Sequence, residues 1–225
     1  MADETIREKA AIATRPGPAT WVGLFLTLFG MLLIRQIFRM INPDPGTGLV
    51  VVREVFYFAS AGALLWLVTH WERLPLTSIG LRTSVWWKSV LWGLVTMVLC
   101  GGVAAVLVQL TGYGHGPGSS AMDRLPLWLI VVIVFRAGIV EELFYRGYAI
   151  ERLQAVGLGR AASAVLPLLV FAIAHYTGGA ANILIALVLG AILTGFYLWR
   201  RDLVANIIAH TLVDLVANVL GHLAK

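Results

Sequence analysis

The chain has 225 residues, of which 59% are hydrophobic and only 13% are charged, and its net charge is +5. Soluble globular domains carry about 25% charged residues. The composition therefore leaves too little polar surface for a water-soluble domain and predicts an integral membrane protein.

Seven apolar runs follow a short N-terminal segment. They extend over residues 21–40, 49–71, 85–110, 125–150, 160–176, 182–199 and 203–223. About 20 apolar residues cross the core of a bilayer, and clusters of Gly and Pro between several runs favour turns. We therefore predict an all-α fold, a polytopic transmembrane bundle of about seven membrane-spanning helices around a buried polar catalytic cavity. Eight helices are the alternative, if the N-terminal segment or the Gly-rich loop at 112–118 forms a further short helix.

Lys and Arg residues predict how the bundle is oriented, because they are enriched in cytoplasmic loops. Most of them fall on the cytoplasmic side when the N-terminus is placed inside. Residues 1–18 are then a short cytoplasmic tail, and residues 19–225 form a single membrane domain. This topology explains the basic residues, so we expect membrane lipid and no nucleic acid as a partner. Nothing in the sequence marks a eukaryotic organelle, which favours a bacterial inner membrane.

Two adjacent glutamates, Glu141 and Glu142, stand in the fourth apolar run. Charge inside a membrane span is costly and by default indicates a functional site. On an α-helix, residues four apart share a face, so Glu142 lies beside Arg146 while Glu141 is turned away from it. We expect Arg146 to neutralise Glu142 and Glu141 to stay free as a base. The alternative interpretation is that both acids are simply solvated at a cytoplasmic helix end.

Histidines occur in two later apolar runs. His175 comes late in the fifth run, and histidine can carry a proton or bind a metal near neutral pH. In the last run His210 and Asp214 are four residues apart on one face, and a polar stripe in a membrane helix must face protein or water. We interpret the other polar residues of this stripe as structural: Asn206, Asn218 and His222.

Three other chemistries lack their sequence patterns. The chain has no His-Glu-x-x-His helix, no Gly-x-Ser-x-Gly elbow, and no Gly-Lys-Ser/Thr ending to its Gly-rich loop. We therefore expect neither a zincin helix nor a serine hydrolase nor a phosphate loop, and no organic cofactor.

Taken together and in order, three motifs resemble those of the CPBP family. They are Glu-Glu-x-x-x-Arg, Phe-x-x-x-His and His-x-x-x-Asp, where the family has Asn or Asp at the last position. This family contains the type II CAAX prenyl endopeptidases and bacterial relatives linked to bacteriocin processing and self-immunity. The resemblance covers about residues 125–220.

The resemblance implies a role for each motif residue. Glu141 and His175 are expected to activate a water molecule, with Glu142 and Arg146 as the supporting pair. His210 and Asp214 are expected to hold the oxyanion or, in another account, to help bind a metal. A zinc ion bound through His175 and His210 is thus an alternative to a metal-free glutamate mechanism, and a zinc site with an open water position would suit these ligand types.

The expected function is that of an intramembrane endopeptidase of the CAAX protease type. It would hydrolyse a peptide bond in a membrane-associated or lipidated protein. The alternatives are a non-catalytic immunity protein that binds bacteriocin-like peptides and a proton-coupled transporter. For Glu141 and His175 to meet at one depth in the membrane, the fourth helix must extend toward residue 155 or tilt.

Overall fold

The computed structural model describes residues 16–81, 86–113, 122 and 124–220. In these residues all regular structure is helical and no strand occurs, which confirms the predicted all-α fold. Three predicted features lie outside the described residues. They are most of the N-terminal tail, most of the Gly-rich loop in which an eighth helix was the alternative, and the end of the last apolar run with His222.

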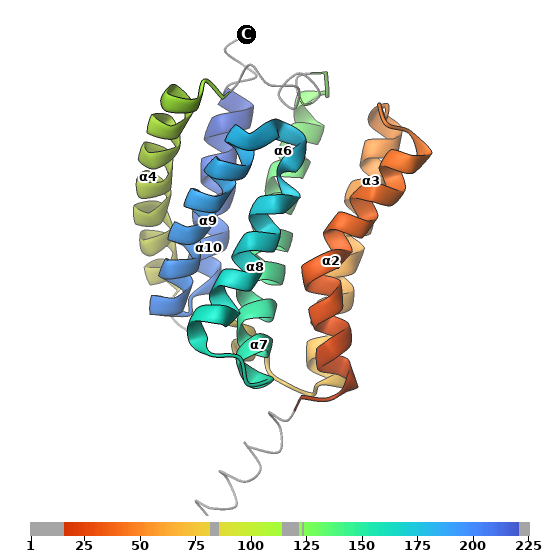
Figure 1. Ribbon diagram of the computed structural model, residues 1–225, viewed down its shortest axis with the longest axis vertical. Coiled ribbons are helices and arrows are strands. Elements are labelled where there is room, and N and C mark those ends of the chain that lie inside the picture. Colours follow the sequence, from red (N-terminus) through yellow and green to blue (C-terminus); the bar gives the residue numbers. More distant parts are fainter. Residues whose placement is uncertain (1–15, 82–85, 114–121, 123, 221–225) are drawn as a thin grey trace, which may run out of the picture.

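Seven long helical segments in the described part of the chain coincide, to within a few residues, with the predicted apolar runs. They alternate in direction along the bundle (Figure 1). In chain order they are α2 (Pro18–Ile41); α3 (Thr47–Trp66) continued by η1 (Leu67–Trp71); α4 (Trp86–Thr111); α6 (Leu127–Arg136) continued by η3 (Ala137–Ile150) and α7 (Glu151–Ala155); α8 (Arg160–Ala174); α9 (Gly179–Arg200); and α10 (Leu203–Asp214) continued by η5 (Leu215–Leu220). Two single turns, η2 (Leu76–Ile79) and η4 (Tyr176–Gly178), lie in the connections.

Breaker and capping residues explain where several helices begin and end. α2 ends at Ile41, directly before a segment that contains Pro43 and Pro45, neither of which has a backbone N–H to continue the ladder. Asp202 caps α10, because its carboxylate accepts a hydrogen bond of 3.1 Å from the backbone N–H of Ala205.

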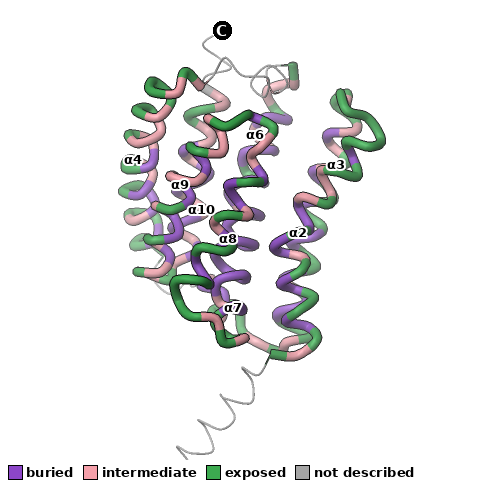
Figure 2. Tube along the Cα trace, in the orientation of Figure 1, coloured by how far each residue is buried: buried purple, intermediate pink, exposed green. Residues whose placement is uncertain are grey.

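The helix formed by α6, η3 and α7 is the centre of the bundle. It packs against α2, α3, α8 and α10, and every residue of η3 except Ile139 is buried (Figure 2). The helix runs without a break from Leu127 to Ala155. This confirms the prediction that it extends toward residue 155, and it sets the two adjacent glutamates well inside the molecule.

Small residues let the helices around the site approach closely. A side chain in place of Gly138 would bring a Cβ atom to 1.9 Å from Oγ1 of Thr211, so α10 lies directly on η3 at this point. α4 packs against α10, and its buried residues are all small: Ser89, Gly93, Thr96 and Cys100. Small residues are typical of helix contacts in membranes, where they allow backbones to come together.

Four helical segments in the described residues are long and apolar enough to cross a membrane: Pro18–Ile41, Thr47–Trp71, Trp86–Thr111 and Tyr176–Arg200. Two further apolar helices, Arg160–Ala174 and Leu203–Val219, are shorter. Length and composition thus identify four candidate spans among the described residues, and the number of about seven stays a prediction. Large apolar side chains cover much of the outer surface, as a lipid-facing surface requires; they include Trp21, Phe25, Phe56, Trp66, Val98 and Leu169.

Candidate active site

The wide turns of η3 place both glutamates beside an arginine. Its backbone hydrogen bonds follow the π-helical pattern from residue i to i+5, so side chains five apart lie nearly above one another. Nη1 of Arg136 donates to Oε1 of Glu141 at 2.7 Å, and Nη1 of Arg146 donates to Oε1 of Glu142 at 2.7 Å. The central helix therefore carries two ion pairs, one on each of two faces.

This arrangement corrects the prediction that Glu141 stays free. The prediction assumed α-helical spacing, on which residues 136 and 141 point in different directions. However, only Oε1 of Glu141 accepts a hydrogen bond, because its Oε2 is buried and has no hydrogen-bond partner among the described residues. The alternative of solvated acids is wrong, since Glu141 is 6% and Glu142 0% exposed.

Arg136 is itself held by α3. Its Nε donates to Oε2 of Glu54 at 2.8 Å, and its guanidinium lies over the ring of Tyr57 at 4.8 Å from the centroid. Oε1 of Glu54 accepts in turn from Nη2 of Arg53 at 2.9 Å. Sequence reasoning missed Arg136 and Glu54, although a charged residue inside an apolar run is the signal that could have found both.

Glu142 uses both of its oxygens within the protein. Besides Arg146, its Oε1 accepts from Nδ1 of His210 at 2.8 Å, and its Oε2 accepts from the amide nitrogen of Asn206 at 3.0 Å. The predicted pair of Glu142 and Arg146 is thus present, and it ties the central helix to α10. Asn206 takes part in this network, in keeping with its interpretation as a structural residue.

Arg146 extends the same network to α9 and α8. It is 1% exposed and donates to the carbonyl oxygen of Gly190 at 3.2 Å and to Oγ1 of Thr194 at 3.4 Å. Its guanidinium also lies over the ring of Phe171, 4.3 Å from the centroid. With this many partners Arg146 fixes the positions of three helices relative to one another.

The two histidines differ in what fixes their rings. Nδ1 of His175 lies 2.8 Å from the carbonyl oxygen of Phe171, and since a carbonyl only accepts, Nδ1 carries the proton and Nε2 of a neutral ring is an acceptor. His210 donates through Nδ1 to Glu142, while its Nε2 faces Oδ2 of Asp214 at 3.6 Å. Asp214 is 30% exposed and is the most accessible member of the set.

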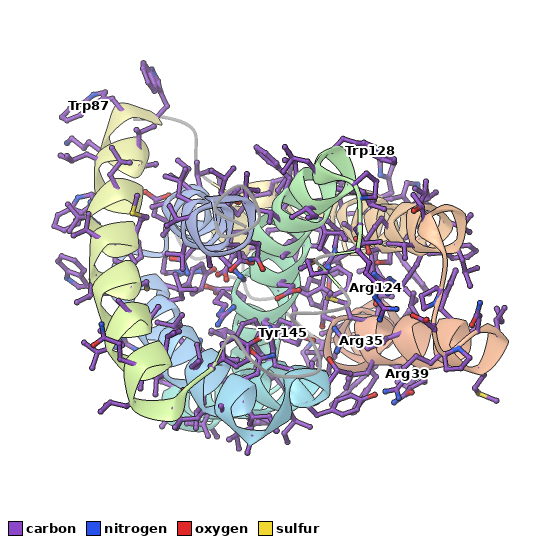
Figure 3. All side chains as sticks on the ribbon, turned by 90° about the horizontal axis from the view of Figure 1, so that it is seen from above. Arg35, Arg39, Trp87, Arg124, Trp128 and Tyr145 are labelled. Carbon is purple, nitrogen blue, oxygen red and sulfur yellow. The ribbon has the colours of Figure 1, made fainter. Side chains whose placement is uncertain are left out.

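Two cavities adjoin these residues. The larger, of about 100 Å³, is lined by Asn182, His175, His210, Asp214 and apolar side chains of α4, α8, α9 and α10. The smaller, of about 10 Å³, is lined by Met31, Leu32, Arg35, Glu141, Tyr145, Phe171, Ala174 and His175. His175 and Phe171 belong to both. Seen from above, Tyr145 lies in the middle of the molecule with Arg35 on its α2 side, whereas Trp87 and Trp128 lie at the outer edge (Figure 3).

The structure thus brings the predicted site residues together in two groups. Glu141 and His175 share the small cavity, and His175, His210 and Asp214 share the large one. Glu142 and Arg146 line neither of these two cavities and lie behind them. Arg35 was missed by sequence reasoning, because its position near a helix end marks it as a topological residue; its Nη1 donates to the carbonyl oxygen of Ala174.

The described residues do not supply a zinc site of the predicted kind. No three side chains of His, Cys, Asp and Glu among them are arranged to hold a metal ion, whereas a zinc ion in a protein takes at least three such ligands. Glu142 is already bonded to Arg146, His210 and Asn206, and one oxygen of Glu141 to Arg136. The polar side chains of the site therefore act through hydrogen bonds and ion pairs with one another.

The chain was compared with known proteins. No curated protein and no solved structure matched it. The family model described as type II CAAX prenyl endopeptidase Rce1-like matches residues 123–216, the part of the chain that holds all three motifs. Together with the apolar helices, this match indicates an integral membrane protein of a protease family. This part of the sequence is thus similar to the Rce1-like type II CAAX prenyl endopeptidase family, the group that the motifs predicted.

Proposed function

We propose that the protein is an intramembrane endopeptidase that hydrolyses a peptide bond in a membrane-associated or lipidated, CAAX-type protein. One observation carries this proposal. One carboxylate oxygen of Glu141 is fixed by Arg136, and the other has no hydrogen-bond partner among the described residues. Glu141 and His175 both line the small cavity. A carboxylate held in this way is oriented but still able to accept a proton, which is what a general base needs.

The proposed reaction is the direct addition of water to the peptide carbonyl. Glu141 takes one proton from the water, aided by Nε2 of His175, as the water oxygen bonds to the carbonyl carbon. The tetrahedral intermediate then collapses, the carbon–nitrogen bond breaks, and the proton passes from Glu141 to the leaving nitrogen. The products are a new carboxyl terminus and a free amine, with all atoms of the water accounted for.

His210 is the proposed donor to the oxyanion of the intermediate. Its Nδ1 is bonded to Glu142, so the ring is held in place and Nε2 is the atom that the larger cavity offers to substrate. Preorganised donors of this kind stabilise charge that develops only in the transition state. Asp214, 3.6 Å from Nε2, is proposed to act through His210 by favouring a proton on that nitrogen.

The larger cavity is the proposed binding site for the substrate chain. Most of its lining is apolar, with Phe171, Ile185, Ala186 and Leu189 among the side chains. An apolar lining suits the hydrophobic residues or the lipid of a membrane-associated substrate. We propose that such a substrate enters from the bilayer of a bacterial inner membrane, in which the N-terminus of the protein is cytoplasmic.

Peptide cleavage by the purified full-length protein in detergent or lipid vesicles tests the proposal. Candidate substrates are fluorescent membrane peptides with and without a prenylated cysteine. The Glu141→Gln variant should lose at least about 100-fold in kcat, since a general base contributes about 10²–10⁴-fold. The matched control is Glu72→Gln, because Glu72 is also a buried carboxylate paired with an arginine, Arg152 at 2.8 Å, but lines neither cavity.

The Glu72 variant should be less stable but should cleave normally. Cleavage that survives the Glu141 change would refute the proposal. If the protein instead protects cells against a bacteriocin and this protection survives the Glu141 change, a non-catalytic immunity function is supported. Substrate uptake into vesicles driven by a pH gradient would support a proton-coupled transporter.

A further inference from the structure

The small cavity beside Glu141 is lined by a second residue with a polar atom that the proposed mechanism has not used. This atom is the hydroxyl oxygen of Tyr145, a side chain 2% exposed on the buried central helix. Like Oε2 of Glu141, it is buried and has no hydrogen-bond partner among the described residues. Both side chains line the same cavity of about 10 Å³, together with His175 and Arg35.

Two unpaired polar atoms at one buried cavity point to an occupant. A buried hydroxyl or carboxylate oxygen without a partner destabilises the folded state, and such atoms are rare in folded proteins. A cavity of about 10–15 Å³ holds one water molecule, provided that it offers the water two to four polar partners. This cavity has the volume for one water and at least three polar groups around it.

Packing accounts for the ring of Tyr145 but not for its hydroxyl. The ring contacts Phe171 edge to face, with centroids 5.5 Å apart, and a phenylalanine would make the same contact. The hydroxyl adds a polar atom to a buried site in a membrane helix, where its desolvation is unfavourable. A function that needs an O–H group at this point explains its presence.

We propose that Tyr145 is a further catalytic residue, whose hydroxyl and Oε2 of Glu141 together hold the single water molecule that attacks the peptide bond. This inference rests on the proposed function and deepens it. The two residues are four apart on η3 and therefore neighbours on the helix surface. The two atoms do not bond each other, since neither has a partner among the residues that the structure describes, and a bridging water would satisfy both.

The hydrogen-bonding capacities of the groups orient the water. Oε2 of Glu141 accepts one of its protons and Nε2 of His175 can accept the other, while Tyr145 donates to one lone pair of its oxygen. The second lone pair is then free for the carbonyl carbon. During attack the carbon–oxygen bond forms and Glu141 takes one proton, which it later gives to the leaving nitrogen as the carbon–nitrogen bond breaks. Tyr145 keeps its own proton throughout, so its role is to fix the position of the nucleophile.

The variant Tyr145→Phe removes the hydroxyl and keeps the ring. The matched control is Tyr148→Phe, on the same helix three residues further on. Tyr148 is also buried, but its hydroxyl donates to Oε1 of Glu72 at 2.8 Å and lies outside both cavities. For Tyr145→Phe we expect kcat to fall by about 10- to 100-fold with KM unchanged, and the melting temperature to stay the same or rise. For Tyr148→Phe we expect the reverse, a lower melting temperature and an unchanged kcat.

A second measurement does not depend on cleavage. A crystal structure of the full chain at a resolution that shows ordered water should contain a water between Tyr145 and Glu141, and the Tyr145→Phe variant should lose it. A lower kcat with an unchanged KM in Tyr145→Phe, together with the loss of this water molecule, supports the inference. An unchanged kcat, or a wild-type cavity without ordered water, overturns it. If Glu141→Gln abolishes cleavage while Tyr145→Phe cleaves normally, the proposed function stands and the inference fails.

Discussion

Replacing Arg136 by methionine should lower the stability of the protein, because this buried cation neutralises two carboxylates. Arg136 is 6% exposed and bonds Glu54 at 2.8 Å and Glu141 at 2.7 Å. Removing one partner of a buried ion pair destabilises a protein by about 3–5 kcal/mol, because the other charge stays buried and unpaired. Glu54 keeps its bond from Arg53, so the penalty falls mainly on Glu141. We therefore expect the free energy of unfolding to drop by about 3–5 kcal/mol.

Thermal unfolding in detergent, followed by circular dichroism, measures this drop. For a chain of about 150–250 residues, 1 kcal/mol corresponds to about 2–4 °C, so the melting temperature should fall by about 6–20 °C. Arg160→Met is the control, because Arg160 is an exposed arginine that donates to one carbonyl oxygen. This substitution should change the free energy of unfolding by less than about 0.5 kcal/mol.

A double-mutant cycle decides whether the effect comes from the unpaired Glu141 carboxylate. Adding Glu141→Gln to Arg136→Met removes the buried charge, so the double variant should be more stable than the sum of the two single effects by about 1–3 kcal/mol. Additivity within about 0.5 kcal/mol would mean that the two residues are not coupled. Arg136 would then neither neutralise nor orient Glu141.

Three further predictions concern the rest of the site. Asp214→Asn should keep cleavage within about tenfold of wild type, because the Glu142 carboxylate at Nδ1 still holds the ring of His210 and favours its doubly protonated form, in which Nε2 can donate; a loss as large as that of Glu141→Gln in the same peptide assay would show that the charge of Asp214 is essential. Dialysis against a zinc chelator should leave the cleavage rate unchanged, since no three His, Cys, Asp or Glu side chains of the described chain form a metal site; activity lost and then restored by added zinc would contradict this. Gly138→Ala should lower the melting temperature and weaken cleavage, because its Cβ would meet Thr211 at 1.9 Å and overpacking costs about 1–3 kcal/mol. Gly62→Ala, with no atom within 4 Å of the new Cβ, should lower neither, and equal melting temperatures for the two variants would count against close packing at residue 138.

Periodicity along one helix explains what could be predicted from the sequence. The apolar runs determine where the helices lie, because each run needs a lipid-facing or buried surface of its own. The pair of Glu142 and Arg146 followed from a spacing of four, which brings side chains together in α-helical and in π-helical turns alike. The ion pair of Glu141 with Arg136 could not be predicted from the sequence. Its two residues are five apart, and this spacing brings side chains together only where the turns of the helix widen.

Contacts between helices could not be predicted in the same way. Glu54 meets Arg136 across 82 positions of sequence, and no periodic pattern states which face of α3 is turned toward the central helix. The environment of Tyr145 is a similar case, since only the packing of α2, η3 and α8 around a small cavity shows that its hydroxyl has no partner among the described residues. In both cases the sequence shows a polar side chain inside an apolar segment, but it does not show which groups surround that side chain.

The site also depends on helices that lie outside the part of the chain matched by the family. Residues 123–216 contain Glu141, His175, His210 and Asp214. However, Arg136, which donates to Oε1 of Glu141, is held by Glu54 on α3, and Arg35 on α2 is among the residues that line the small cavity. A buried arginine bonded to two carboxylates keeps one orientation only while both are present. The orientation of Glu141, whose Oε2 has no partner in the described part of the chain, therefore depends on the packing of α3 against the central helix. Substitutions in the first two helices should change the activity of this site without touching any of its three motifs.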